Sequence, residues 1–360
     1  MSARLIAISG LGAKGPASFL LETGASRILL DFGQGPDAEA LPSFEAIGPV
    51  DALVLSHGHK DHLGALPHID RIGRPPVFAT DRVLRQVPAD LDRRALPARG
   101  GAEILGVTVT TGRSGHAPGG VWLHFDVGKG FLYTGDYCRE AAVYVFDDPP
   151  ASGTLLLDAS YGINDQNLSF GQDALARMAT DGPLLLPSPA DGRGPDMALF
   201  LHERGHQIAL DDATHAAVSL LAEDGEHTSA DVRKRLDALK RGVRPLVPDS
   251  PAKGVMIASN GTGSSGVAAA LIERWRSDPG LRIVFTGHIG KGSPAERLVM
   301  SGRASVVRWN VHPRLQDNLW LARAVNAWQI IPAFLKVEDA REFGMAFAGA
   351  RVSTERVTAL

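Results

Sequence analysis

A short apolar strand that runs directly into a histidine-rich loop constrains this sequence more than any other feature. Residues 52–55 read Ala-Leu-Val-Leu, and the loop after them contains four potential metal ligands: His57, His59, Asp61 and His62. The apolar run, bounded by Ser56 and Gly58, predicts a buried strand that ends in a loop, with a helix beginning near Asp61. Imidazole and carboxylate groups suit zinc, and one loop can direct several of them at one point. The alternative, a solvated polar turn, rarely produces this density of ligands.

Three further aspartates lie at or near the ends of other apolar segments, and one further histidine lies in a loop. The strands expected at 27–33, 130–137 and 154–158 each carry an aspartate at or near their end: Asp31, Asp136 and Asp158. His116 stands in a glycine-lined loop. Each of these residues alone would be an ordinary loop residue or strand cap. Strands at Leu5–Ser9 and Ser18–Glu22 flank a glycine-rich turn, which we interpret as hairpin geometry.

Composition sets the class of protein. The 360 residues are 44% hydrophobic and 21% charged with a formal net charge of −3, which is typical of a globular protein of two or three domains. The charge neither indicates nor excludes nucleic acid. The single cysteine, Cys138, excludes an internal disulfide and fits a reducing compartment. Met1–Leu5 lacks the apolar core of a secretory signal and no apolar run could span a membrane, so we expect a cytoplasmic protein without a membrane partner.

The His-x-His-x-Asp-His loop, followed in order by His116 and Asp136, resembles the signature of the metallo-β-lactamase fold superfamily. Four later segments resemble its β-CASP branch, which includes ribonuclease J and the mRNA 3′-end processing endonuclease. They are 154–162, 183–193, 255–266 and 309–318, and residues 284–294 resemble a further strand and loop of the same branch. The resemblance implies an α/β fold, namely an αββα sandwich with an inserted parallel-sheet cap domain. The implied boundaries are residues 1–162 and 305–360 for the metallo-β-lactamase domain and 163–304 for the insert.

The resemblance also implies roles for individual residues. His57, His59 and His116 would hold a first zinc ion, Asp61 and His62 a second, and Asp136 would bridge them. Asp31 would orient the ligands from behind. A bridging water could then ionise near neutral pH and attack phosphorus. The catalytic residues implied are Asp61, His312 and Asp158, with His312 protonating the leaving oxygen and Asp158 orienting His312.

The last strand departs from the branch pattern. Ala333 or Phe334 stands where relatives carry a histidine ligand of the second metal, and no histidine follows His312. We therefore expect one or two Zn²⁺ ions per chain with a weak second site, and Mn²⁺ as an alternative ion. Water or His288 could complete that site.

Substrate contacts are expected on glycine-containing loops that precede helices, because their backbone N–H groups attract anions. The residues are Ser188, Arg193, Ser264, Ser265 and Gly266. The basic run 233–235 has helical spacing with interleaved acids, which is typical of a solvated face, and phosphate contact is its alternative.

Three classes of function remain open at this point. The first is a zinc-dependent phosphodiesterase, a nuclease acting on single-stranded RNA or, less readily, DNA. The second is a zinc hydrolase of a small substrate such as a thioester, lactone or nucleotide. The third is a metal-poor nucleic-acid-binding relative with reduced catalysis. The sequence does not distinguish an endonuclease from an exonuclease, and it leaves open whether the chain forms a homo-oligomer.

Overall fold

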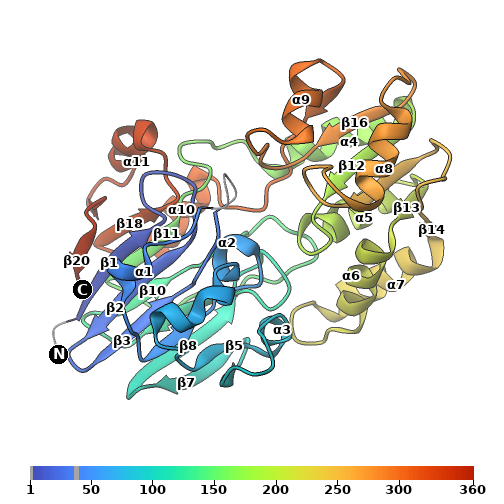
Figure 1. The fold of residues 1–360 in the computed structure, drawn as a ribbon. Helices are drawn as coiled ribbons and strands as arrows, with labels where there is room; N and C mark the ends of the chain where they lie inside the picture. Colours follow the sequence, from blue (N-terminus) through green and yellow to red (C-terminus); the bar gives the residue numbers. More distant parts are fainter. Residues whose placement is uncertain (1–2, 36–39) are drawn as a thin grey trace. The chain divides into compact units, whose positions relative to one another are not determined.

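The computed structural model describes residues 3–35 and 40–360, and these divide into two compact units (Figure 1). The first unit comprises residues 1–139, 146–165 and 312–360, and the second comprises residues 140–145 and 166–311. The chain therefore enters the second unit twice, first with the short segment 140–145 and then with residues 166–311, and returns to the first unit each time. Within the described ranges, no helix combines the length and the apolar character needed to cross a bilayer.

The first unit contains two seven-stranded sheets. One has the order β20-β1-β2-β3-β4-β5-β6. Its strands are β1 Ala3–Ser9, β2 Ser18–Thr23, β3 Ser26–Leu30, β4 Ala52–Val54, β5 Val77–Thr80, β6 Arg93–Leu96 and β20 Val357–Ala359. The other has the order β19-β18-β11-β10-β9-β8-β7. Its strands are β7 Gly100–Ile104, β8 Val107–Arg113, β9 Val121–Phe125, β10 Phe131–Tyr133, β11 Thr154–Asp158, β18 Gln329–Ala333 and β19 Arg351–Val352.

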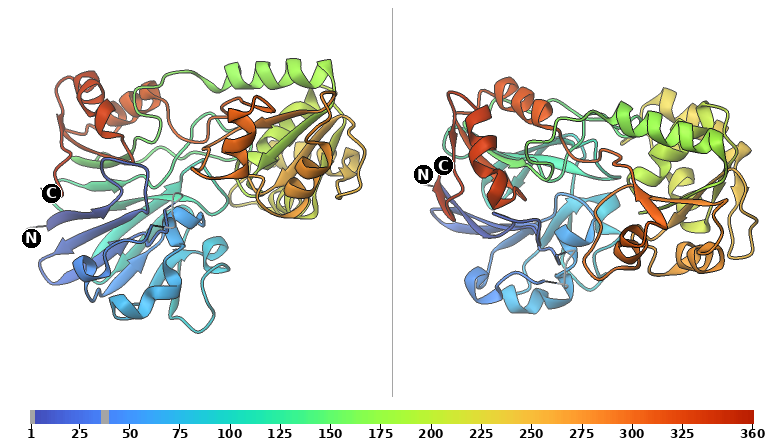
Figure 2. Two further views of the ribbon diagram at one scale, coloured as in Figure 1. Left: turned by 45° about the horizontal axis from the view of Figure 1, so that its top comes forward. Right: turned by 90° about the horizontal axis from the view of Figure 1, so that it is seen from above.

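Helices cover the outer faces of both sheets (Figure 2, left). The first sheet is covered by α1 Phe44–Ile47, α2 Lys60–Leu63, η1 Leu66–Ile72 and α3 Asp81–Leu84, and the second by α10 Leu315–Ala324 and α11 Ala340–Ala346. The short turn η2 Val337–Asp339 precedes α11 and has no buried residue. Side chains alternate between the layers, as the two-residue period of a strand requires. In β2, Phe19 and Leu21 enter the core between the sheets, whereas Leu20 packs under the helices. The expected αββα sandwich is confirmed.

Strands β7 and β8 form a hairpin, because Leu105 and Gly106 adopt φ values of 52° and 78° and reverse the chain. One local expectation needs correction. The strand expected at 27–33 ends at Leu30, and Asp31 turns away with φ 57°. A non-glycine residue at positive φ costs energy, so surrounding contacts must hold Asp31 there.

The second unit contains one six-stranded parallel sheet of order β14-β13-β15-β12-β16-β17. Its strands are β12 Leu184–Ser188, β13 Ile208–Leu210, β14 Arg244–Pro245, β15 Val255–Ser259, β16 Arg282–Phe285 and β17 Ala304–Val306. Its helices are α4 Leu168–Asp181, α5 Arg193–Glu203, α6 Asp212–Glu223, α7 Ala230–Gly242, α8 Gly266–Trp275 and α9 Pro294–Met300.

Both faces of this sheet are buried, which explains why its strands read as continuous apolar runs. In β12, Leu184 and Leu186 join the cluster under α4 to α7, and Leu185 joins the cluster under α8 and α9. The basic run on α7 is largely paired, since Arg235 binds Glu203 at 2.6 Å and Arg233 donates to the Thr228 carbonyl. These contacts support the interpretation of this run as a solvated helix face.

Asp196 on α5 holds the short segment 140–145 within the second unit. Its Oδ1 accepts hydrogen bonds from the backbone N–H groups of Ala142 and Val143 at 3.0 and 3.1 Å, and its Oδ2 accepts from Trp309 Nε1 at 2.9 Å. Burial raises the pKa of Asp196 to about 6, and the three donors only partly offset this effect.

This pKa predicts a pH-dependent stability. Because the folded pKa lies above the unfolded value of 3.8, the stabilisation is complete below pH 3.8 and is lost as pH rises through about 6. The advantage of the wild type over Asp196→Ala in unfolding free energy should therefore shrink by up to about 3 kcal/mol across this range. Urea unfolding on either side of this interval measures it. The exposed control Asp173→Ala should show no such trend, and an advantage that stays constant with pH would contradict the assignment.

Candidate metal centre

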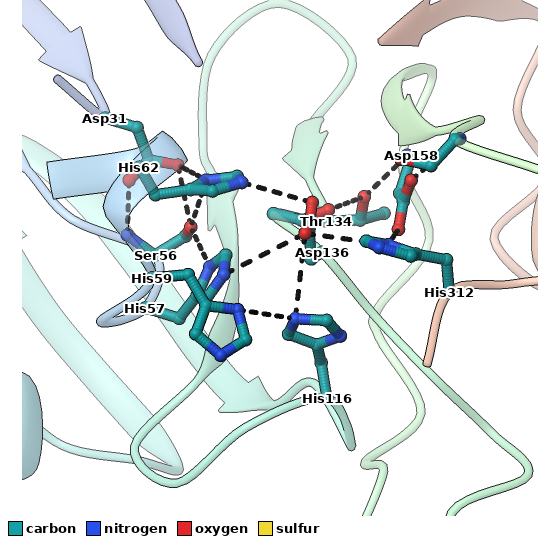
Figure 3. A network of polar contacts seen from close by, with 12 residues as sticks. Asp31, Ser56, His57, His59, His62, His116, Thr134, Asp136, Asp158 and His312 are labelled. Atoms are coloured by element: carbon teal, nitrogen blue, oxygen red, sulfur yellow. Dashed lines mark hydrogen bonds and ion pairs between the residues drawn. The ribbon is translucent and has the colours of Figure 1, made fainter. Parts of the chain in front are cut away.

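The metal-ligand residues of the sequence converge at one edge of the first unit, where strands of both sheets end (Figure 3). His57 follows β4, His59 precedes the first turn of α2, and Asp61 and His62 lie within that helix. His116 comes from the loop between β8 and β9, and Asp136 from the segment after β10. Parallel strands such as β3 and β4 place their carboxyl ends on the same edge, so residues far apart in sequence meet there.

Asp136 stands at the centre of the cluster, as Figure 3 shows. Its Oδ1 lies 3.2 Å from His62 Nε2, and its Oδ2 lies 3.9 Å from His57 Nε2, 3.6 Å from His116 Nε2 and 3.5 Å from His312 Nδ1. Burial alone would raise the pKa of Asp136, but the surrounding imidazoles, His62 first, hold it well below its usual range. The carboxylate is therefore ionised and can contact ions on both sides.

The ligand atoms fit a metal ion. In the part of the chain that the structure describes, four buried atoms of the cluster have no hydrogen-bond partner: His57 Nε2, His59 Nε2, His62 Nε2 and Asp136 Oδ1. His62 Nε2 and Asp136 Oδ1 lie 3.2 Å apart, but the geometry of this contact is not that of a hydrogen bond. Buried polar atoms without partners are costly, and cations bound by these groups would satisfy them. Among the described residues, three groups have ligand atoms within 4.8 Å of one another: His57, His59, His116 and Asp136; Asp61, His62 and Asp136; and Asp136, Asp158 and His312.

Burial also sets the protonation of the first group. It lowers the pKa of His57 well below the usual value, and neighbouring imidazoles add to the effect. Burial lowers the pKa of His59 as well, although Asp61 and Asp136 oppose the shift. Both rings are therefore neutral near pH 7, which is the form that binds a metal ion.

Asp31 holds the loop from behind, as its position in the sequence suggested. Its Oδ1 accepts from the Ser56 backbone N–H at 2.7 Å, and its Oδ2 contacts Ser56 Oγ at 2.7 Å, His62 Nδ1 at 2.6 Å and Tyr133 Oη at 2.5 Å. Burial and the nearby carboxylate raise the pKa of Tyr133 well above its usual value, so its hydroxyl donates. The contact with Nδ1 directs Nε2 of His62 towards Asp136. Sequence reasoning did not identify Ser56 or Tyr133 as parts of this network.

His312 and Asp158 form a buried pair beside the ligand cluster. His312 Nδ1 lies 2.9 Å from Asp158 Oδ2, and Asp158 Oδ1 accepts from the Ser160 backbone N–H at 3.0 Å. The ring of Tyr161 packs edge-on against His312 with 5.2 Å between ring centroids. These contacts orient the ring so that Nε2 points away from Asp158. The pair also lies within ligand distance of Asp136, so a role of His312 as a metal ligand is the alternative.

Phe334 lies beside the second ligand group. Its ring packs edge-on against His62, with 5.7 Å between ring centroids, whereas Ala333 pairs with Asp158 between β18 and β11. Phe334 adopts φ 63°, which turns its side chain out of the strand alternation. Of the two positions that the sequence left open, Phe334 is therefore the one adjacent to the second group. A phenyl ring offers no lone pair to a metal ion.

The residues expected to contact phosphate all lie in the second unit, beyond the carboxyl ends of β12 and β15. Ser188 ends β12, and its buried Oγ has no partner within residues 3–35 and 40–360. Arg193 begins α5 and donates from Nε to Thr286 Oγ1 at 3.0 Å. Asn260 Oδ1 organises the serine-glycine loop by accepting from the Ser264 backbone N–H at 3.1 Å. The remaining two residues, Ser265 and Gly266, begin α8. His288 lies in this unit as well.

Comparison with known proteins finds one matching protein family and several proteins of similar sequence. Residues 11–169 match the family described as "Metallo-beta-lactamase superfamily". The chain is 23% identical to Transcription termination factor FttA of Methanosarcina mazei over 82% of this chain and 57% of that protein. It is 23% identical to Endoribonuclease ysh1 of Schizosaccharomyces pombe over 79% of this chain and 45% of that protein. The chain thus spans about half the length of these relatives.

Two further matches cover more of the compared protein. The chain is 24% identical to Ribonuclease TTHA0252 of Thermus thermophilus over 79% of this chain and 78% of that protein. A crystal structure of a protein of unknown function from Enterococcus faecalis V583 superposes over the full length of both chains with a TM-score of 0.64 at 12% identity. That likeness concerns the fold alone.

The position of Phe334 leads to a prediction about metal occupancy. Phe334→His should raise the metal content towards two ions per chain, because an imidazole there would supply the second group with a further ligand. Ala333→His is the matched control: that position is 1% exposed within the core, so the change should destabilise the fold without adding metal. Elemental analysis after chelator dialysis measures both. If the unmodified protein already retains two ions, another side chain completes the site.

Proposed function

We propose that this chain, a metallo-β-lactamase superfamily protein of the β-CASP branch, is a metal-dependent phosphodiesterase that cleaves RNA. The observation that carries the proposal is the buried ligand cluster around Asp136 with an oriented His312–Asp158 pair beside it. The names of the relatives support RNA as the substrate, since two of them are ribonucleases by name. A cytoplasmic location and a single-stranded substrate belong to the same proposal.

The ligand set suits zinc. His57, His59, His116 and Asp136 would hold a first ion, and Asp61, His62 and Asp136 a second. Ions held there would polarise the phosphate and lower the pKa of a water molecule that attacks phosphorus. Asp31 keeps His62 in position for this role through its hydrogen bond to Nδ1.

His312 supplies the proton for the leaving oxygen in this proposal. Asp158 accepts the hydrogen bond from Nδ1, and a carboxylate in that position stabilises the protonated ring. Nε2 is then the atom that delivers the proton. Because Asp158 is itself held by the Ser160 N–H, the imidazole needs little reorganisation during the reaction.

Phe334 favours a second candidate, a nucleic-acid-binding relative with reduced catalysis. Its ring stands beside His62, so the second ion would have fewer protein ligands than a complete site offers. A nuclease assay with end-labelled RNA and DNA separates the candidates. Cleavage of RNA that ceases on chelation supports the phosphodiesterase, whereas tight RNA binding without cleavage supports the second candidate. Activity on a thioester or lactone alone would contradict both.

The role of His312 predicts a specific kinetic signature. His312→Ala should lower the turnover of RNA by roughly 10²–10⁴-fold while leaving the metal content unchanged, because the variant lacks an acid but no ligand. His215→Ala, which removes an exposed histidine on α6, is the control and should have no effect. Loss of metal in His312→Ala would identify His312 as a ligand, and unchanged turnover would make it a structural residue.

A further inference from the structure

The glycine-rich segment Gly10–Pro16 between β1 and β2 does more than reverse the chain. It carries Lys14, whose Nζ lies 3.4 Å from Nε2 of His312. Nδ1 of the same ring faces Asp158, so the contact with Lys14 is made on the side of His312 that is turned away from Asp158. Lys14 therefore lies at the atom through which His312 would act on a substrate.

Backbone contacts hold this loop at both ends. The Phe334 N–H donates to the Gly10 carbonyl at 2.7 Å, and the Ala17 N–H donates to the Asp61 carbonyl at 2.8 Å. Gly10 has φ 88°, and a Cβ there would come within 2.7 Å of the Phe19 ring, so this close approach requires glycine. The position of Lys14 is therefore linked to the metal-ligand helix on one side and to the end of β18 on the other.

The charge of Lys14 has no counter-ion among residues 3–35 and 40–360: no carboxylate there forms an ion pair with it. The side chain is half-buried, and a half-buried ammonium beside a proton-transfer site is suited to an anion that arrives with the substrate. In the proposed reaction, that anion is the phosphodiester itself.

We propose that Lys14 is a phosphate-binding catalytic residue, whose ammonium group binds a non-bridging oxygen of the scissile phosphate next to His312. This inference rests on the proposed function. In the hydrolysis, the water oxygen bonds to phosphorus and releases one proton to solvent. The bond from phosphorus to the leaving oxygen breaks, and His312 protonates that oxygen. Lys14 transfers no proton and acts by its charge.

The environment of the second ligand group explains why the positive charge of Lys14 would matter in the proposed reaction. With Phe334 beside His62, the second ion lacks one protein ligand. Charge that develops on the phosphate must be stabilised by preorganised positive groups, whether metal ions or side chains. A lysine fixed next to His312 supplies part of that stabilisation without depending on metal occupancy.

The test compares Lys14→Met and Lys14→Gln, which remove the charge, with Lys14→Arg, which keeps it. Lys129→Met is the matched control, because Lys129 is an exposed lysine of the same unit in the turn before β10, at the other end of that strand from Asp136. Steady-state kinetics on single-stranded RNA give kcat and KM at several salt concentrations. Elemental analysis and circular dichroism measure metal content and folding for each variant.

We expect Lys14→Met and Lys14→Gln to lower kcat/KM by roughly 10–100-fold, which is the effect of losing one charge-assisted hydrogen bond in the transition state. The slope of log kcat/KM against log salt should become shallower by about 0.7, as for one lost phosphate contact on a single strand. Lys14→Arg should recover most of both effects, and metal content should not change.

Two results would overturn this inference while leaving the proposed function intact. In one, the wild type cleaves RNA and both neutral variants match Lys129→Met in kcat/KM and salt slope. In the other, Lys14→Arg is as impaired as the neutral variants, or the neutral variants lose metal or fold, which makes the lysine structural. A wild type that cleaves neither RNA nor DNA would instead refute the proposed function.

Discussion

The first unit buries several potential metal-ligand atoms without hydrogen-bond partners, and the free-energy cost of that burial constrains its structure. Three histidine nitrogens and one carboxylate oxygen of the central cluster are buried and lack hydrogen bonds within the described ranges. Each such atom costs about 1–3 kcal/mol unless something satisfies it. A cation satisfies several at once, so metal binding and folding of this edge are thermodynamically linked.

Carboxylates on either side of the ligand cluster hold its side chains in position. Asp31 accepts hydrogen bonds from the loop and from Tyr133, and this explains why it keeps an unfavourable φ of 57°. Asp158 holds His312 in the same manner on the opposite side of Asp136. Phe334, which offers no ligand atom, lies beside the second ligand group, whereas the ammonium group of Lys14 contacts His312.

Much of this arrangement could be predicted from the sequence, because its motifs resemble those of the metallo-β-lactamase superfamily and the resemblance implies where they meet. Asp158 ends its strand, Asp31 and Asp136 follow theirs, and the histidine-rich loop follows a strand that runs parallel to β3. Other features depend on contacts between distant segments, which no local pattern encodes. The Tyr133–Asp31 hydrogen bond, the choice between Ala333 and Phe334, and the approach of Lys14 to His312 are of this kind.

The metal content of the purified protein tests the central claim most directly. Native mass spectrometry with elemental analysis, applied to the wild type and to His59→Ala, counts the ions that each chain holds. The account predicts at least one tightly bound zinc or other transition-metal ion per wild-type chain, and its loss in His59→Ala together with a lower unfolding temperature. A wild-type protein prepared without chelators that contains no transition metal, and gains no stability when Zn²⁺ is added, would contradict the account.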